Sequence, residues 1–209
     1  MLVRDIMSSP AVAIGPDVTL ERAFRILCDE GIRHLPVMEE GRLVGVVSDR
    51  DLRLATSVLA LSQLPPTSPV SKVMSREPMT ADVSDPIEDV AFRMRERKIG
   101  CLPVMDEGRL IGIVTGLDLL DALLRMTGVD KPSGRLEVRL PDHPGELSRL
   151  TAFLSHRNLN VHSILTYPEG HDSTRAVLRI GSIEIRALAH ELRNDDFEVL
   201  WPPAKPCPR

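Results

Sequence analysis

Apolar residues recur in the N-terminal part of the chain with two different spacings. Four of them share the i, i+3, i+4, i+7 spacing that places side chains on one face of a helix, namely Leu20, Ala23, Phe24 and Leu27. Thr19 suits the start of this helix. Two short apolar stretches follow at 35–38 and 43–47, with Gly41 between them. Because glycine adopts the positive φ of a tight turn, the pattern predicts a β-hairpin.

The same pattern returns later in the chain. A shift of 67 residues aligns residues 3–52 with residues 70–119 without gaps, and 17 of the 50 pairs are identical. The apolar helix positions of the second copy are Ile87, Val90, Ala91 and Met94. Each copy, led by an extended segment at 12–14 or 79–81, is predicted to be a β-α-β-β-α unit. One such unit is too small to bury both faces of its sheet, so we expect the two copies to pack as a pseudo-symmetric pair.

The segment 135–201 follows a different pattern. Strands are predicted at 136–140, 160–166, 174–180 and 197–201, and the two helices between them carry apolar faces at Leu147, Leu150, Thr151, Leu154 and at Ile185, Leu188, Ala189, Leu192. The resulting order, β-α-β-β-α-β, is the ferredoxin-like motif. The fold class expected for the whole chain is therefore mixed α/β (α+β). The predicted boundaries are 1–62 and 63–127 for the repeats, 135–201 for the third domain and 202–209 for a disordered, proline-rich tail.

Composition and charge narrow the function. The net charge of −4 and the pI near 5.9 disfavour general nucleic-acid binding, which needs a basic face. No stretch is long and apolar enough for a membrane helix, and the N-terminus lacks a signal-peptide core, so we expect a cytoplasmic protein. The three widely spaced cysteines, Cys28, Cys101 and Cys207, suggest neither a disulfide framework nor a zinc site.

Each repeat carries one polar motif at the predicted end of a strand and start of a helix. It consists of a glycine, two apolar residues, a hydroxyl residue, two variable residues and an aspartate. The first copy has Gly45, Ser48 and Asp51, and the second has Gly112, Thr115 and Asp118. A hydroxyl at a helix N-terminus suits a phosphate, and a carboxylate one turn later can accept hydrogen bonds from both hydroxyls of a ribose. The glycine would let a flat base approach the backbone.

A purely structural role for this motif stands beside the ligand role. Ser-x-x-Asp before an apolar helix is also a capping box, in which the hydroxyl and the carboxylate bind backbone N–H groups. The occurrence of the motif at the same point of both copies favours ligand binding at one site or more. The two roles are compatible.

Residues 1–125 resemble the CBS-domain family, because both copies keep the Leu-Pro-Val strand, the glycine turn and the complete glycine-to-aspartate motif. The resemblance implies two clefts that bind AMP, ADP, ATP or S-adenosylmethionine and no other required cofactor. It assigns the ribose to Asp51 and Asp118, and the phosphate to Ser48 and Thr115. The resemblance does not decide which adenosine ligand is bound.

The two clefts are not expected to be equivalent. The first copy carries Arg33, His34, Asp49 and Arg50, where the second has Gly100, Cys101, Gly116 and Leu117. Arg33 and Arg50 suit phosphate groups, so the first cleft is predicted to prefer the more highly phosphorylated ligand. The alternative is that both arginines are solvated surface residues.

The third segment resembles the ACT domain through Asp142-His143-Pro144-Gly145 after its first strand and Asn158-Leu159-Asn160-Val161 before its second. The resemblance implies pairing with a second copy and an amino-acid site lined by Asp142, Gly145 and Asn160. A purely dimerising role and a helix N-cap role for Asp142 are the alternatives. The order CBS–CBS–ACT further resembles the AcuB family of acetoin-utilisation proteins, which implies a link to acetoin catabolism.

An enzyme is the main rival class, and the sequence offers no catalytic or metal-binding set. The six histidines do not form a metal-binding spacing, and no nucleophile elbow, P-loop or dinucleotide fingerprint occurs. We therefore expect a non-enzymatic homodimer that regulates an unidentified enzyme, with a linker at 121–134 passing the nucleotide signal to the ACT segment. A ligand-free structural or dimerisation module remains the alternative.

Overall fold

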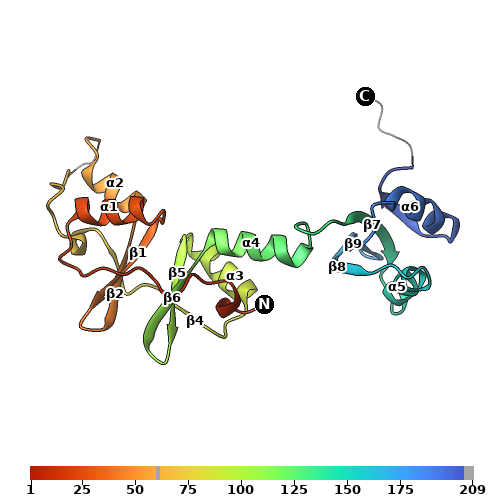
Figure 1. Ribbon diagram of the computed structural model, residues 1–209, viewed down its shortest axis with the longest axis horizontal. Helices are drawn as coiled ribbons and strands as arrows, with labels where there is room; N and C mark the ends of the chain where they lie inside the picture. The colour runs from red at the N-terminus through yellow and green to blue at the C-terminus, as the bar shows by residue number, and fades with distance from the viewer. Residues whose placement is uncertain (60–61, 205–209) are drawn as a thin grey trace. The chain divides into compact units, whose positions relative to one another are not determined.

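The computed structural model describes residues 1–59 and 62–204, and the chain divides into two compact units, Met1–Leu120 and Asp121–Arg209 (Figure 1). Helices and strands alternate along both units, which confirms the mixed α/β class.

The first repeat forms a hairpin with two helices packed on it. Helix α1 (Leu20–Asp29) precedes strands β1 (His34–Glu39) and β2 (Arg42–Ser48), and helix α2 (Asp49–Thr56) follows directly. In Figure 1, α1 and α2 lie next to each other beside the β1–β2 hairpin. Thr19 caps α1 as expected, because its side chain accepts a hydrogen bond from the backbone N–H of Arg22 at 3.2 Å. Gly41 has the expected positive φ of 78° in the hairpin turn.

The second repeat copies this arrangement down to the strand register. Its elements are β4 (Ala81–Asp82), α3 (Ile87–Arg97), β5 (Cys101–Asp106), β6 (Arg109–Thr115) and α4 (Gly116–Thr127). In the first hairpin His34 pairs with Ser48, and in the second Cys101 pairs with Thr115. The register shift between Val37 and Met38 recurs between Val104 and Met105. The aligned sequences therefore fold into superimposable hairpins.

The segment in front of each repeat packs on the other repeat. The short helix η1 (Val3–Asp5) places Val3 in the core of the second repeat, where its N–H donates to the carbonyl of Asp85 at 3.0 Å. The corresponding helix η2 (Val70–Lys72) places Val70 in the core of the first repeat, where its N–H donates to Val18 at 2.8 Å. Strand β3 (Ser75–Arg76) then joins the first hairpin as a third strand beside β2. This exchange ties the two repeats together.

The predicted helix faces are mostly buried, with exceptions. Leu20, Ala23 and Leu27 lie in the first core, whereas the side chain of Phe24 is 37% exposed. Phe24 lies beside the guanidinium of Arg53 (5.7 Å from the ring centroid). Ala91 of the second repeat is only partly buried. In the third segment Leu150 and Leu154 are buried, but Leu147 and Thr151 lie outside the core.

The second unit is a four-stranded antiparallel sheet with two helices. Its elements are β7 (Gly134–Pro141), α5 (Glu146–His156), β8 (Val161–Pro168), β9 (Ser173–Ile180), α6 (Ile185–Asn194) and β10 (Glu198–Trp201). The strand order is β10-β7-β9-β8, which confirms the ferredoxin-like topology. Alternate residues of β7, beginning with Leu136 and Val138, are fully buried in one core with residues of both helices.

The segments 121–134 and 202–209 were expected to be a linker and a disordered tail. Helix α4 continues to Thr127, whose carbonyl accepts a 2.7 Å hydrogen bond from the hydroxyl of Ser163 on β8, so the first part of the expected linker at 121–134 is helical. Of the expected disordered tail 202–209, residues 205–209 lie outside the described residues. Pro202 is buried, and its carbonyl accepts a hydrogen bond from Arg193 at 2.5 Å.

Among residues 1–59 and 62–204, no helix combines the length and the apolar character needed to cross a bilayer.

Candidate functional site

A cleft of about 970 Å³ lies where the first hairpin ends and α2 begins. Its walls come from both repeats and include the predicted site residues Arg33, His34, Ser48, Arg50 and Asp51. The hairpin register explains this convergence, because His34 pairs with Ser48 and the N–H of Asp49 donates to the carbonyl of Arg33 at 3.0 Å. Its volume lies within the range of about 300–1,000 Å³ typical of small-molecule sites.

Asp51 and Ser48 form a capping box at the start of α2. One carboxylate oxygen of Asp51, Oδ2, accepts hydrogen bonds from the Ser48 N–H at 2.9 Å and from the Ser48 hydroxyl at 2.6 Å. The Asp51 N–H donates to the Ser48 hydroxyl at 3.3 Å. Within the described part of the chain, no residue donates to the other oxygen, Oδ1. The structural role is therefore present, and it leaves one carboxylate oxygen of this cleft residue without a hydrogen-bond donor among the described residues.

The second copy has the same capping box. Oδ2 of Asp118 accepts from both the N–H and the hydroxyl of Thr115 at 2.7 Å. These two residues and Gly112 line neither the 970 Å³ cleft nor the smaller apolar cavity of about 240 Å³ beside α1 and α2. The structure therefore places the two copies of the motif in different surroundings.

Cationic side chains dominate the cleft. Arg33, Arg50, Arg53 and Lys98 line it, against the carboxylates of Asp49 and Asp51. Arg53 is paired with Asp49 at 2.7 Å. Over residues 1–59 and 62–204, no carboxylate lies within ion-pair distance of Arg33, Arg50 or Lys98. In a chain with a net charge of −4, this local excess of unpaired positive charge favours an anionic ligand.

Sequence reasoning missed the part of the cleft supplied by the second repeat. Lys98, Ile99, Gly100 and Cys101 line the cleft from the second repeat, and Val46, Pro78 and Met79 give it apolar surface. A flat apolar base would fit against such a surface. The alignment of the two copies could have indicated these residues. In a pseudo-symmetric pair, the turn before each hairpin lies close to the motif of the other copy.

Gly45 and Gly112 are explained by chain packing. A Cβ atom at Gly45 would lie 2.6 Å from Sδ of Met74 and 3.0 Å from the carbonyl oxygen of Ser75. At Gly112 it would lie 2.7 Å from the carbonyl oxygen of Ser8. The segments in front of the two repeats, which contain Ser8 and Met74, thus occupy the space that was expected to receive a base. A direct contact of either glycine with a ligand stays a prediction.

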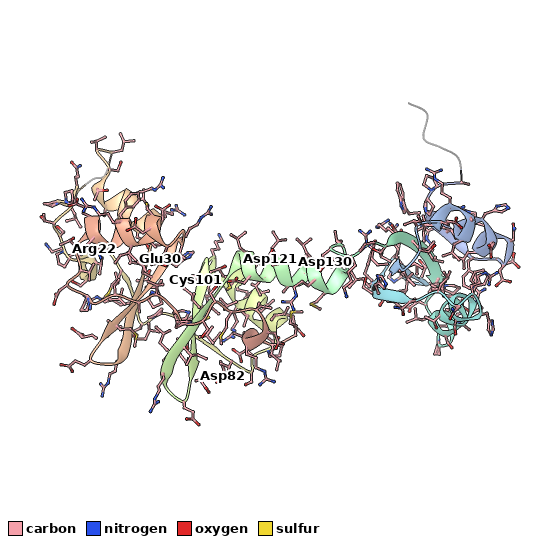
Figure 2. All side chains as sticks on the ribbon, viewed as in Figure 1. Arg22, Glu30, Asp82, Cys101, Asp121 and Asp130 are labelled. Carbon is pink, nitrogen blue, oxygen red and sulfur yellow. The ribbon has the colours of Figure 1, made fainter. Side chains whose placement is uncertain are left out.

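His34 and Cys101 occupy equivalent positions in the two hairpins, and both line the cleft. Figure 2 labels Cys101 at the start of β5. Burial lowers the pKa of His34, and the Arg33 charge acts in the same direction, whereas the carboxylates of Asp51 and Asp49 oppose the shift. Burial, together with the negative charge of Asp51, raises the pKa of the Cys101 thiol to about 12. Cys101 is therefore a packed thiol and a poor nucleophile near neutral pH.

The predicted amino-acid site does not come together within one chain. Asp142 follows β7 at the end where β9 begins, and its carboxylate accepts a hydrogen bond from the Thr174 hydroxyl at 3.1 Å. Asn160 precedes β8 at the other end of β9, and its carbonyl accepts from the Gly181 N–H. The length of β9 separates them by roughly 23 Å at 3.3 Å per residue. Gly145, with φ of 101°, caps α5, so the N-cap role expected for Asp142 is wrong.

Within the described part of the chain, His, Cys, Asp and Glu side chains form no group of three or more that could hold a metal ion. The cleft brings together cations, two carboxylates and one neutral imidazole. Such a set suits the binding of a phosphorylated nucleoside.

Sequence models of two families match the chain. The CBS domain model matches residues 3–57 and 70–125, and the ACT domain model matches residues 134–193.

Curated relatives match over the same region. A CBS domain-containing protein of Dictyostelium discoideum is 38% identical over 135 residues, which cover 60% of this chain and 93% of the relative. The CBS domain-containing protein YhcV of Bacillus subtilis is 32% identical over 117 residues, which cover 56% of this chain and 81% of YhcV. An L-aspartate semialdehyde sulfurtransferase of Methanocaldococcus jannaschii is 34% identical, but the match covers only 22% of that enzyme. The match to this enzyme therefore concerns one part of a larger protein.

Solved structures share the fold of the paired repeats. The CBS domain pair of protein MJ0100 in complex with 5′-methylthioadenosine and S-adenosyl-L-methionine has a TM-score of 0.54 and 30% identity, covering 63% of this chain and 98% of that chain. CBSX2 in complex with AMP has a TM-score of 0.54 and 29% identity, covering 60% and 97%. A putative acetoin utilization protein (AcuB) from Vibrio cholerae has a TM-score of 0.54 and 27% identity, covering 64% and 98%.

Proposed function

Since the chain belongs to the CBS-domain family and carries two CBS domains followed by an ACT domain, we propose that it is a non-enzymatic regulatory sensor of adenosine nucleotides. The proposed ligand is AMP, ADP or ATP, bound in the cleft between the two CBS domains. The observation that carries the proposal is the convergence of the Ser48–Asp51 motif with the unpaired cations Arg33, Arg50 and Lys98 on one cleft.

Each part of the cleft has a role in this proposal. The free Oδ1 of Asp51 accepts hydrogen bonds from the ribose hydroxyls, while Oδ2 stays in the capping box. The phosphates lie at the start of α2, where the helix dipole and Arg33 and Arg50 favour negative charge. The apolar surface around Val46 and Met79 contacts the adenine. The complexes of MJ0100 and CBSX2 with adenosine compounds support this class of ligand.

The cations favour a phosphorylated ligand over S-adenosylmethionine. Arg33, Arg50 and Lys98 would face the positively charged sulfonium and amino groups of S-adenosylmethionine. They would instead pair with the oxygens of a nucleotide. We therefore rank ATP and ADP before AMP, and AMP before S-adenosylmethionine.

The ACT domain is proposed to pair two chains. Asp142 and Asn160 lie at opposite ends of β9, so only a second copy would bring the two ends together. An amino-acid site lined by Asp142, Gly145 and Asn160 therefore requires the proposed homodimer. Dimerisation without an amino acid is the simpler form of this proposal.

We propose a link to acetoin catabolism in the cytoplasm, with an enzyme as the regulated partner. The similarity of the CBS pair to the putative acetoin utilization protein from Vibrio cholerae supports this link, together with the order CBS–CBS–ACT. No residue of the cleft recognises acetoin itself, so acetoin is proposed as the context and not as the ligand.

A calorimetric titration of the full-length chain with AMP, ADP, ATP and S-adenosylmethionine tests the proposal. Binding of at least one nucleotide at micromolar to millimolar concentration is expected, with ATP the tightest. No heat of binding and no rise in melting temperature with any of the four would reject it. The chain would then be a ligand-free module that mediates assembly.

A further inference from the structure

Lys98 is the cation that the second repeat contributes to the cleft. It follows α3, and it lines the same cleft as Ser48, Arg50 and Asp51 of the first repeat. Lys98 is solvent-exposed, and none of the described carboxylates forms an ion pair with it. Its position in the first repeat is taken by Gly31. The cleft therefore gains a positive charge for which the sequence repeat offers no counterpart.

Lys98 adopts a backbone conformation that favours glycine. It has φ of 54° and ψ of 40°, in the left-handed region, as the C-cap of α3. Gly31, at the equivalent turn, has φ of 65° and adopts this conformation without strain. A lysine in place of glycine therefore costs local stability, and its place among the cleft residues is the observation that suggests a role for its side chain.

We propose that Lys98 is the residue with which the cleft distinguishes ATP and ADP from AMP. The inference rests on the proposed function, in which Asp51 holds the ribose and the start of α2 holds the nearest phosphate. Lys98 comes from the other repeat, and in this proposal it meets the phosphates farthest from the sugar. A nucleoside polyphosphate then contacts both repeats, whereas AMP contacts Lys98 weakly or not at all.

The substitution Lys98→Gln tests this role, because it removes the charge of the side chain and keeps most of its length. The affinities of the wild-type protein and of this variant for AMP and ATP are measured by calorimetry. ATP affinity is expected to fall about tenfold, the size of one lost charge-assisted hydrogen bond. AMP affinity should change less than twofold, and Lys98→Arg should restore ATP affinity. Lys72→Gln is the matched control, because Lys72 is exposed and does not line the cleft.

A second variant separates this role from a structural one. Lys98→Gly relieves the left-handed strain and should raise the melting temperature while still lowering ATP affinity about tenfold. An equal loss of AMP and ATP affinity in Lys98→Gln, or an unchanged ATP affinity in either variant, would overturn the inference. If the wild-type protein bound no nucleotide at all, the proposed function itself would fail.

Discussion

The two CBS repeats share their fold and differ in their chemistry. Both hairpins have the same register, and both motifs form the same capping box with an aspartate. The first motif lines the cleft with the unpaired cations, whereas Gly112, Thr115 and Asp118 do not line this cleft. The second repeat has Gly116, Leu117 and Leu120 where the first has Asp49, Arg50 and Arg53. The motif thus forms the same helix start in both repeats, and the residues around it distinguish the cleft that is proposed to bind a nucleotide.

The largest expected effect is a loss of nucleotide affinity on substitution of Asp51 but not of Asp118. Asp51→Ala should lower nucleotide affinity about 100-fold, because two hydrogen bonds between ribose hydroxyls and a carboxylate are lost. Asp118→Ala removes the same capping-box contacts in the second repeat, so it is a matched control for the loss of helix capping. It should change affinity in the first cleft less than twofold. Equal losses of affinity in both variants, measured by calorimetry, would remove the distinction between the repeats.

Substitution of Gly45 or Gly112 tests how tightly each hairpin packs against the segment in front of the other repeat. Gly112→Ala should lower the free energy of unfolding by about 1–3 kcal/mol, because the new methyl group meets the backbone carbonyl of Ser8. Gly45→Ala should cost less, since its closest contact is the flexible side chain of Met74. Gly116→Ala is the control, with open space around the added methyl group. Urea unfolding would refute this view if the three variants were equally stable.

Arg50 tests whether charge makes the first cleft selective. Arg50→Ala should lower ATP affinity about fivefold more than AMP affinity, because the guanidinium pairs with phosphate oxygens. Leu117→Ala changes the equivalent position of the second repeat and should leave both affinities unchanged. An ATP-to-AMP affinity ratio that Arg50→Ala does not alter would show that Arg50 is a solvated surface residue.

The smallest effect concerns the pH dependence of stability. In the unfolded chain His34 titrates near its ordinary pKa of about 6.5, whereas burial lowers its pKa in the folded protein. Below about pH 6.5 the unfolded state therefore binds more protons, and the free energy of unfolding should decrease as the pH falls. The groups that face His34 are Arg33, Asp49 and Asp51.

Urea unfolding between pH 7.5 and pH 5 measures this dependence. His34→Gln should weaken it, because glutamine does not titrate. Cys101, the equivalent residue of the second repeat, has a thiol pKa of about 12 and contributes no change of charge in this range. If wild type and His34→Gln lost stability equally, the burial of His34 would not be the cause.

Local patterns predicted the elements of the fold well. The spacing of Leu20, Ala23 and Leu27 gave α1, and Gly41 gave the hairpin turn with its positive φ. The exchange of the lead segments was not predicted, because it depends on contacts between residues far apart in the chain. The identical pairs Val3–Val70 and Met7–Met74 were a signal that these segments matter. They did not show on which repeat the segments pack.

The candidate site was predicted in part. The motif marked Ser48 and Asp51, and the differences between the copies marked Arg33, His34 and Arg50, all of which line the cleft. Lys98 was missed because it lies outside the motif and aligns with Gly31. Thr115 and Asp118 were predicted to line a second nucleotide cleft, yet a local motif carries no information about which cleft it faces. Their role in ligand binding stays a prediction.

A crystal structure of the 209-residue chain grown with saturating ATP would show directly whether the first cleft binds a nucleotide. We expect one nucleotide in this cleft, with its ribose hydroxyls on the carboxylate of Asp51 and its phosphates between Arg50 and Lys98. An empty cleft under these conditions, or a nucleotide whose sugar lies away from Asp51, would contradict this expectation.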